Sequence, residues 1–290
     1  MSTTTLDPAT TLGPVHLRVR DLDRSIRFYT NILGFTLAAR EGDTAALTTG
    51  GADTWLRLTA LPDAQSRPPR ATGLYHIAIL TPSRQALARS LRRLAEQDYS
   101  LTGVADHLVS EALYLDDPDG NGLEIYRDRP REDWPRLNGQ IQMASDPLDL
   151  RALLAEGLDD ERPWTGLDPA TRVGHMHLRV SNLDDAARFY QDTLGFDLIT
   201  RFGGSAAFLS VGGYHHHIGL NTWESRGGSP PPPNAVGLRA FDIVLPGEAG
   251  LAQVGERLRA AGAEGEARDG AIETRDPSGN GVRLRVAATA

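Results

Sequence analysis

The chain has 290 residues, a formal net charge of −8 at pH 7, 40% hydrophobic and 23% charged residues, and no cysteine. This length predicts two domains or one domain built from repeats, and the composition is typical of a folded globular protein. The absence of cysteine excludes disulfides, iron–sulfur clusters and a cysteine nucleophile, so His and carboxylate side chains must bind any metal.

Charge and hydropathy also limit the partners and the location. Because the chain is acidic and its arginines are scattered, a nucleic-acid partner is not expected, and small molecules are the expected ligands. No stretch approaches the roughly 18 consecutive apolar residues that cross a bilayer, and the start, MSTTTLDPATTLG, lacks the basic and apolar regions of a signal peptide. A cytoplasmic protein without a membrane partner is therefore predicted.

An internal repeat organises the chain. Residues 16–35 (HLRVRDLDRSIRFYTNILGF) and 177–196 (HLRVSNLDDAARFYQDTLGF) are identical at 12 of 20 positions. In each copy a short β-type run is followed by an Asp/Asn-rich cap and then by apolar residues at helical spacing. Gly34 and Gly195 stand where a helix commonly ends in a left-handed residue, so each copy predicts a strand followed by a helix.

A second repeat alternates with the first. Residues 117–126 (DPDGNGLEIY) and 276–285 (DPSGNGVRLR) each predict a Gly-rich turn that leads into a strand. Upstream of each turn lies a strand that ends at a proline, followed by a helical stretch. The predicted strands are 75–82 and 240–246, and the predicted helices are 84–96 and 248–261.

Together the two repeats predict four modules, each consisting of one strand, one helix and three further strands. The modules cover residues 13–61, 73–127, 173–221 and 237–287.

Between the modules lie Pro-rich linkers, 61–72 and 224–236, and one long connection, 128–172, that contains a single helix candidate, 147–156. We therefore predict an N-terminal domain over 1–127, a connector over 128–172 and a C-terminal domain over 173–290.

Four such modules in two pairs resemble the vicinal oxygen chelate superfamily, which contains glyoxalases, bleomycin-resistance proteins and type I extradiol dioxygenases. The resemblance covers nearly the whole chain. It is strongest to the bacterial two-domain catechol 2,3-dioxygenase type, through TGLYHIAIL, DHLVSEALYLDDPDGNGLEIYRDRPR, VGHMHLRVSNL and GGYHHHIGLNTW. It implies an α+β fold in which βαβββ modules pair into two domains of curled mixed sheets, with a cup that binds one divalent metal.

The resemblance also implies that metal ligands come from the first and last strands of a module. His76, Glu124 and His175 occupy such places. Two imidazoles and one carboxylate leave coordination positions open and suit a non-heme Fe(II) site, with Mn(II) as the alternative. Singly, each residue could equally be a hydrogen-bonded core residue or an ordinary ion-pair partner, so the prediction depends on their joint placement.

When the four modules are aligned, the candidate metal ligands all fall in the second and third modules. The fourth carries Ala240 and Arg283 at the corresponding positions, and the first carries Pro14 opposite His175. Modules two and three would then pair across the connector and leave modules one and four as a metal-free pair. In a competing arrangement modules one and two pair, and His16 replaces His175; the sequence leaves both arrangements open.

The segment YHHHIGLN (214–221) is predicted on the last strand of module three. Strand alternation would place His215 and His217 on one face and His216 on the other. The resemblance implies that His217 matches the acid–base histidine of extradiol dioxygenases. The alternative is that the triplet is an adventitious metal-binding patch.

Three other residues are candidates for contact with a substrate. Tyr114 precedes the DDPDGNG turn and resembles in its placement the active-site tyrosine of extradiol enzymes, although a cross-strand packing role is an alternative. His107 and His177 are further candidates for substrate binding.

The resemblance implies an extradiol dioxygenase of aromatic hydrocarbon catabolism. Such an oxidoreductase inserts O2 into catechol or a substituted catechol and gives a 2-hydroxymuconic semialdehyde. Its partners would be a small aromatic diol and O2, and open edge strands would allow a homodimer. The alternatives are a glyoxalase-like metal-dependent isomerase or lyase, which usually draws a carboxylate from two modules, and a non-catalytic antibiotic-binding protein, which typically lacks the metal ligands.

Overall fold

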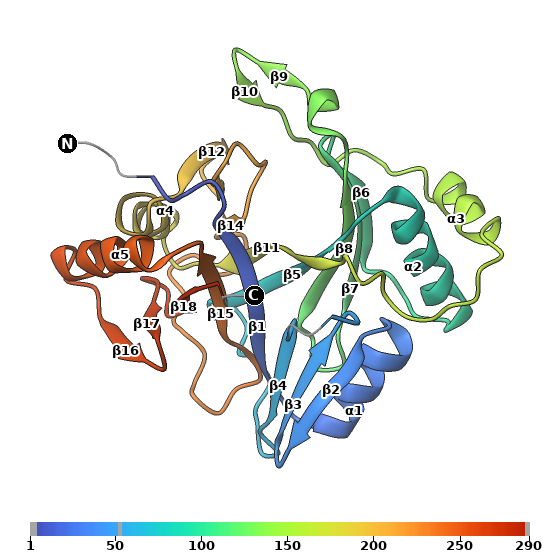
Figure 1. Cartoon of the computed structure of the whole chain (residues 1–290), viewed down its shortest axis with the longest axis horizontal. Helices are drawn as coiled ribbons and strands as arrows, with labels where there is room; N and C mark the ends of the chain where they lie inside the picture. Colours follow the sequence, from blue (N-terminus) through green and yellow to red (C-terminus); the bar gives the residue numbers. More distant parts are fainter. Residues whose placement is uncertain (1–4, 52–53, 288–290) are drawn as a thin grey trace. The chain divides into compact units, whose positions relative to one another are not determined.

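The computed structural model describes residues 5–51 and 54–287 (Figure 1). The chain divides into two compact units. Unit 1 contains the chain up to Leu17, Gln65–Tyr75, and the chain from His175 onward, and unit 2 contains Arg18–Ala64 and His76–Gly174. The predicted domain bounds, 1–127 and 173–290, stay a prediction.

Modules one and two have the predicted order of elements. Module one consists of β1 (Thr11–Val19), α1 (Leu22–Arg27) with a π-helical turn (Phe28–Ile32), β2 (Thr36–Glu41), β3 (Thr44–Thr48) and β4 (Leu56–Ala60). Module two consists of β5 (Gly73–Thr81), α2 (Arg84–Glu96), β6 (Gly103–Asp106), β7 (Ser110–Asp116) and β8 (Gly122–Asp128). Helix α2 begins after Ser83, whose hydroxyl accepts a hydrogen bond from the Ala86 amide at 3.1 Å, and it matches the predicted helix 84–96.

Modules three and four repeat this order. Module three consists of β11 (Arg172–Arg179), α4 (Leu183–Arg188) with a π-helical turn (Phe189–Leu194), β12 (Asp197–Phe202), β13 (Ala206–Ser210) and β14 (Ile218–Asn221). Module four consists of β15 (Gly237–Leu245), α5 (Glu248–Ala260), β16 (Gly265–Arg268), β17 (Ala271–Arg275) and β18 (Gly281–Val286). Gly34 and Gly195 have φ of +88° and +99°, which confirms the left-handed helix ends.

The connector contains more structure than its sequence predicts. It consists of a 3-10 turn (Arg131–Asp133), a hairpin of β9 (Arg136–Leu137) and β10 (Gln140–Ile141), and α3 (Leu150–Leu158). Helix α3 lies beside α2, where Arg92 donates a hydrogen bond to the Gly157 carbonyl at 3.1 Å (Figure 1). A Cβ on Gly157 would come within 2.3 Å of the Ala88 carbonyl oxygen, so this close approach requires glycine. The predicted helix 147–156 is thus present but starts later, because Asp149 is the N-cap.

The strands form two eight-stranded mixed sheets and one two-stranded hairpin. The strand orders are β16-β17-β18-β15-β1-β4-β3-β2, β12-β13-β14-β11-β5-β8-β7-β6 and β10-β9. The first and last strands of modules two, three and four pair in parallel, and the remaining strand pairs within those modules are antiparallel. This arrangement confirms the predicted α+β fold of four βαβββ modules.

A buried tyrosine–aspartate hydrogen bond joins the two modules within each unit. In unit 2 the Tyr29 hydroxyl donates to Asp117 Oδ2 at 2.9 Å, and in unit 1 the Tyr190 hydroxyl donates to Asp276 Oδ2 at 3.3 Å. Burial raises the pKa of both tyrosines and of both carboxyl groups. The tyrosines belong to the first repeat and the aspartates to the second, so the two repeated motifs bind each other.

The same aspartates hold the Gly-rich turns. Asp117 Oδ1 accepts hydrogen bonds from the amides of Asp119 and Asn121, at 2.8 and 2.9 Å, and Oδ2 accepts from the Asn121 side chain at 2.9 Å. Asp276 makes the corresponding bonds in the other unit. Each turn therefore enters its last strand, β8 or β18, in a defined direction.

The third residue of each turn binds the start of a helix. Asp119 Oδ2 accepts from the Arg20 amide at 2.9 Å, and Ser278 Oγ accepts from the Ser181 amide at 2.9 Å. Arg20 and Ser181 each precede the N-cap residue of a first-repeat helix. Both repeats thus use one local arrangement to attach helix to turn.

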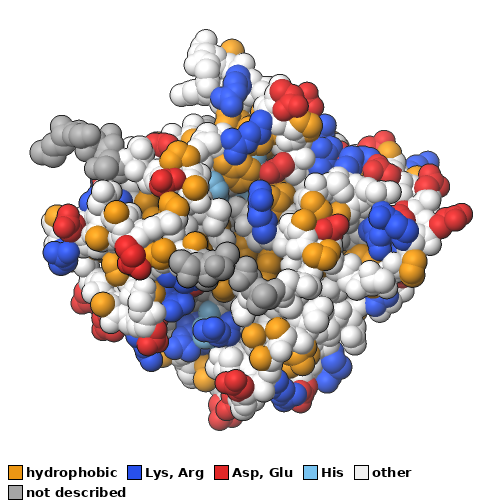
Figure 2. All heavy atoms as spheres, viewed as in Figure 1, with side chains coloured by type: hydrophobic (Ala, Val, Ile, Leu, Met, Phe, Trp, Pro, Cys, Tyr) orange, Lys and Arg blue, Asp and Glu red, His pale blue; other side chains and the backbone are white. Residues whose placement is uncertain are grey.

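None of the helices in the described part of the chain is both long and apolar enough to span a membrane. On the face drawn in Figure 2, acidic and basic side chains are interspersed, with hydrophobic side chains between them.

We predict that Tyr29→Phe lowers the free energy of unfolding by about 1–3 kcal/mol, because a buried carboxylate loses a hydrogen-bond donor. Urea denaturation measures this change. The matched control is Tyr99→Phe, which removes an exposed hydrogen bond to the Asp116 carbonyl and should cost about 0.5 kcal/mol or less. Equal losses in the two variants would contradict the role of the buried bond.

Candidate metal centre

His76 and Glu124 lie close together on neighbouring strands of unit 2. They lie on the parallel strands β5 and β8, where Ala78 is paired with Glu124 and His76 with Gly122. Their side chains are 8% and 2% exposed, and His76 Nε2 lies 2.9 Å from Glu124 Oε2. A buried carboxylate needs a cationic or hydrogen-bonding partner or a metal, and an imidazole at this distance suits either arrangement.

His175 belongs to a group of three buried side chains with potential metal ligands. It lies in β11. The preceding residue, Gly174, leaves no room for a side chain, because a Cβ there would overlap the Tyr126 hydroxyl. Among residues 5–51 and 54–287, one group of side chains brings potential metal-ligand atoms together. It consists of one atom each from His76, Glu124 and His175, and these atoms all lie within 4.8 Å of one another. His16, the sequence alternative to His175, lies on β1 and is not in this group.

The donor set has the chemistry of a non-heme divalent metal site. Two imidazole nitrogens of borderline hardness and one hard carboxylate oxygen provide three ligands, and the chain offers no thiolate. Each of the three side chains is at least nine-tenths buried. The residues present therefore fit a metal such as Fe(II) or Mn(II) better than a soft metal.

Tyr114 and His107 are hydrogen-bonded to each other in unit 2. Tyr114 lies on β7 opposite Glu124 of β8, and its ring centroid is 5.5 Å from that of His76. The Tyr114 hydroxyl is 2.6 Å from His107 Nε2, and His107 Nδ1 is 2.6 Å from the carbonyl oxygen of Ala144. Two of the candidate substrate-contacting residues are thus brought together, and Tyr114 lies beside the candidate ligands His76 and Glu124.

The histidine triplet does not lie on a strand, so this expectation is wrong. β14 begins at Ile218, after a turn in which Gly212 and Gly213 have φ of +61° and +67°. The period-two alternation of side chains therefore does not apply to His215–His217. The prediction failed because the two glycines break the extended backbone that alternation requires.

Within the triplet the rings of His217 and His216 have different neighbours. His217 Nδ1 is 2.8 Å from the hydroxyl oxygen of Ser210. The His216 ring instead lies beside His175, with ring centroids 4.0 Å apart. The assignment of His217 as the acid–base residue stays a prediction, and the sequence signal for His216 is the triplet itself.

The ring of His177 lies against Gly219, the residue of module three that corresponds to Glu124. In unit 1 the register places His177 of β11, Gly219 of β14 and Phe208 of β13 in one row. A Cβ on Gly219 would lie 2.9 Å from His177 Cγ, so the absence of a side chain makes room for this ring. The His177 ring contacts aromatic side chains with centroids at 4.9–5.7 Å, those of Tyr75, Trp223 and Phe208.

Comparison with known proteins places the chain in a family. The Glyoxalase/Bleomycin resistance protein/Dioxygenase superfamily matches residues 11–125 and 172–284. Catechol-2,3-dioxygenase of Bacillus subtilis (strain 168) is 44% identical over 277 residues, which cover 94% of this chain and 96% of that protein. Metapyrocatechase of Geobacillus stearothermophilus is 27% identical over 198 residues, 64% of this chain and 51% of that protein.

A solved structure shows the same fold at low sequence identity. Glyoxalase I of Zea mays superposes with a TM-score of 0.60 at 18% identity, covering 95% of this chain and 92% of that one. The chain belongs to the Glyoxalase/Bleomycin resistance protein/Dioxygenase superfamily, as the module pattern predicts.

Proposed function

We propose that this protein is an extradiol dioxygenase that cleaves catechol or a substituted catechol with O2 to give a 2-hydroxymuconic semialdehyde. The observation that carries the proposal is the 44% identity, over 94% of the chain, with a protein named catechol-2,3-dioxygenase. The buried donor set of His76, Glu124 and His175 supports it, because ring cleavage with O2 requires a metal.

Fe(II) is the proposed metal, with Mn(II) as the alternative, bound by His76, Glu124 and His175. When bound, such a metal supplies a Lewis acid with open positions for both catechol oxygens and for O2. The contribution of the chain is to bury these ligands and to surround them with groups that bind and orient a diol. The short distance between His76 and Glu124 supports the assignment of these two residues.

Tyr114 is proposed as a catalytic residue that hydrogen-bonds to a substrate hydroxyl. The contact of its ring with that of His76 supports this role. His177 is proposed to line the substrate-binding site, since its buried ring lies two residues beyond His175 on the same strand, among aromatic neighbours. His107 acts through Tyr114.

A glyoxalase-like isomerase or lyase is the second candidate function. That chemistry usually uses a carboxylate from two modules, and here the position in module three that corresponds to Glu124 is Gly219. The ring of His177 fills the space that a second carboxylate would need. The presence of Gly219 in place of a second carboxylate favours the dioxygenase over the isomerase or lyase.

A homodimer is also proposed. The six residues of β2 are all exposed, and this strand ends the order of its sheet, so its edge is able to pair with a second copy.

We predict that anaerobic reconstitution with Fe(II), followed by catechol and air, gives a yellow ring-cleavage product with one O2 consumed per catechol. An oxygen electrode and visible absorbance measure both. Glu124→Gln is the control, because an amide of the same shape lacks the carboxylate charge that binds the metal. The proposal fails if the Fe(II)-loaded protein consumes no O2 with catechol or with its alkyl and aryl derivatives.

The third metal ligand is tested by iron content. We predict that His175→Ala lowers the Fe(II) affinity by about tenfold or more, whereas His16→Ala retains wild-type iron content, since only His175 belongs to the converging group. Elemental analysis after dialysis measures the bound iron, and circular dichroism confirms that both variants fold. Iron loss only in His16→Ala would reverse the assignment.

The acid–base histidine is proposed within the triplet. The sequence predicts His217, but the ring contact with His175 supports His216 instead. We predict that His216→Gln lowers kcat by about 10²–10⁴-fold, whereas His217→Gln, in the same loop, keeps kcat within the wild-type order of magnitude. Steady-state oxygen uptake at saturating catechol measures both. The opposite pattern would restore His217.

A further inference from the structure

The end of the connector is hydrogen-bonded to the edge strand β6. The Asp106 amide donates to the Asp146 carbonyl and the Asp146 amide donates to the Asp106 carbonyl, both at 2.9 Å, and the Ala144 amide donates to the His107 carbonyl at 3.4 Å. Residues 144–146, which we call the strap, therefore pair with the end of β6.

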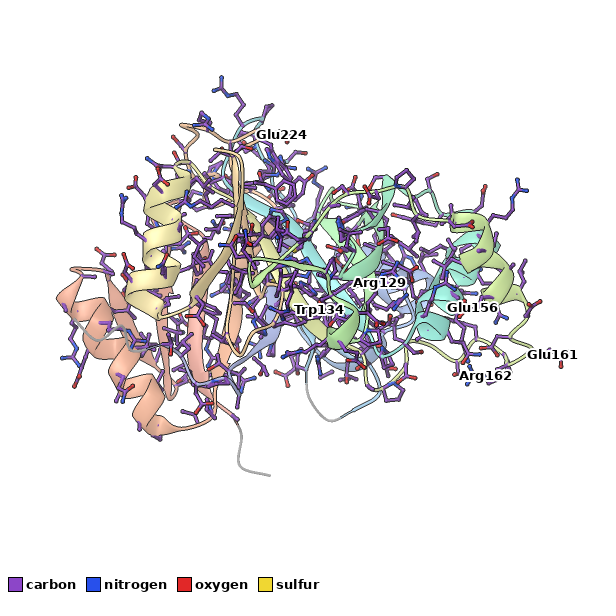
Figure 3. All side chains as sticks on the ribbon, turned by 90° about the horizontal axis from the view of Figure 1, so that it is seen from above. Arg129, Trp134, Glu156, Glu161, Arg162 and Glu224 are labelled. Carbon is purple, nitrogen blue, oxygen red and sulfur yellow. The ribbon has the colours of Figure 1, made fainter. Side chains whose placement is uncertain are left out.

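The start of the connector is held at the same place. Arg129 Nη2 lies 2.6 Å from Asp106 Oδ2, and the Trp134 indole donates to the Arg129 carbonyl at 2.9 Å. Figure 3 shows Arg129 and Trp134 close together in unit 2. Both ends of the hairpin β9–β10 are thus attached near Asp106, and the strap has a defined position.

The strap determines which ring nitrogen of His107 carries a proton. A backbone carbonyl can only accept a hydrogen bond, so the 2.6 Å contact with the Ala144 oxygen requires a proton on His107 Nδ1. In a neutral imidazole the other nitrogen is then an acceptor. The Tyr114 hydroxyl, 2.6 Å from His107 Nε2, must therefore donate its proton to that nitrogen.

We propose that the strap fixes His107 as the Nδ1–H tautomer and that His107, as a positioning residue, makes Tyr114 a hydrogen-bond acceptor toward the substrate. With its only proton directed to His107, the Tyr114 oxygen can bind a ligand hydroxyl only by accepting from it. The last step rests on the proposed function, because the ligand hydroxyl is that of the diol. A doubly protonated His107 would keep its bond to the Ala144 carbonyl but would donate from Nε2 to the Tyr114 oxygen, which frees the Tyr114 proton for donation to a ligand.

The tautomer is tested by nuclear magnetic resonance, independently of activity. The full chain, labelled with ¹⁵N-histidine and loaded with diamagnetic Zn(II), is measured at pH 7 by long-range ¹H–¹⁵N correlation, and His107→Gln identifies the signals of His107. We expect a protonated Nδ1 and an unprotonated Nε2. We also expect Tyr114→Phe to shift the Nε2 signal without changing the tautomer. An Nε2–H tautomer or a doubly protonated ring overturns the proposal.

Kinetics test the consequence for the substrate. His107→Leu cannot accept from Tyr114 and should lower kcat/KM for catechol about tenfold or more, whereas the amide oxygen of His107→Gln can accept and should restore most of it. Equal losses in the two variants contradict a positioning role. A wild-type enzyme that does not cleave catechol contradicts the proposed function, and the resonance experiment still decides the tautomer.

Discussion

The buried hydrogen bond between a tyrosine of one repeat and an aspartate of the other is the constraint on which each unit depends. Tyr29 and Asp117 make this bond in unit 2, and Tyr190 and Asp276 make it in unit 1. The carboxylate cannot be buried without donors, and its own turn together with the tyrosine of the other module provides them. Because β8 follows directly from the turn at Asp117, this bond also sets the position of Glu124.

One fold repeated four times carries different chemistry in each copy through single side chains. The position on the last strand that is Glu124 in module two is Gly219 in module three and Arg283 in module four. The carboxylate is a candidate metal ligand, the glycine admits the ring of His177, and the arginine lies 3.4 Å from Asp242 in an ion pair. Backbone pairing tolerates all three residues because the side chains project away from the ladder of hydrogen bonds.

The histidine triplet and the strap are two features that sequence patterns do not predict. Alternation correctly describes residues on a regular strand, such as the row that contains His177, but it fails at His216 because two left-handed glycines precede it. The contact of His107 with Ala144 leaves no pattern at all, since every residue of the connector has a carbonyl group. The connector helix α3 could be predicted, although its bounds are Leu150–Leu158 and not 147–156, whereas the docking of residues 144–146 on β6 could not.

The sequence by itself determined the four modules, their order of elements, and the donor chemistry available to a metal, because repeats, helical spacing and the lack of cysteine are local properties. It also identified His76, Glu124 and His175 as the ligand candidates. Only the tertiary structure decided which atoms converge and which way each ring points. Those properties depend on strand register, on turns that rotate the backbone, and on backbone acceptors contributed by residues far away in the chain.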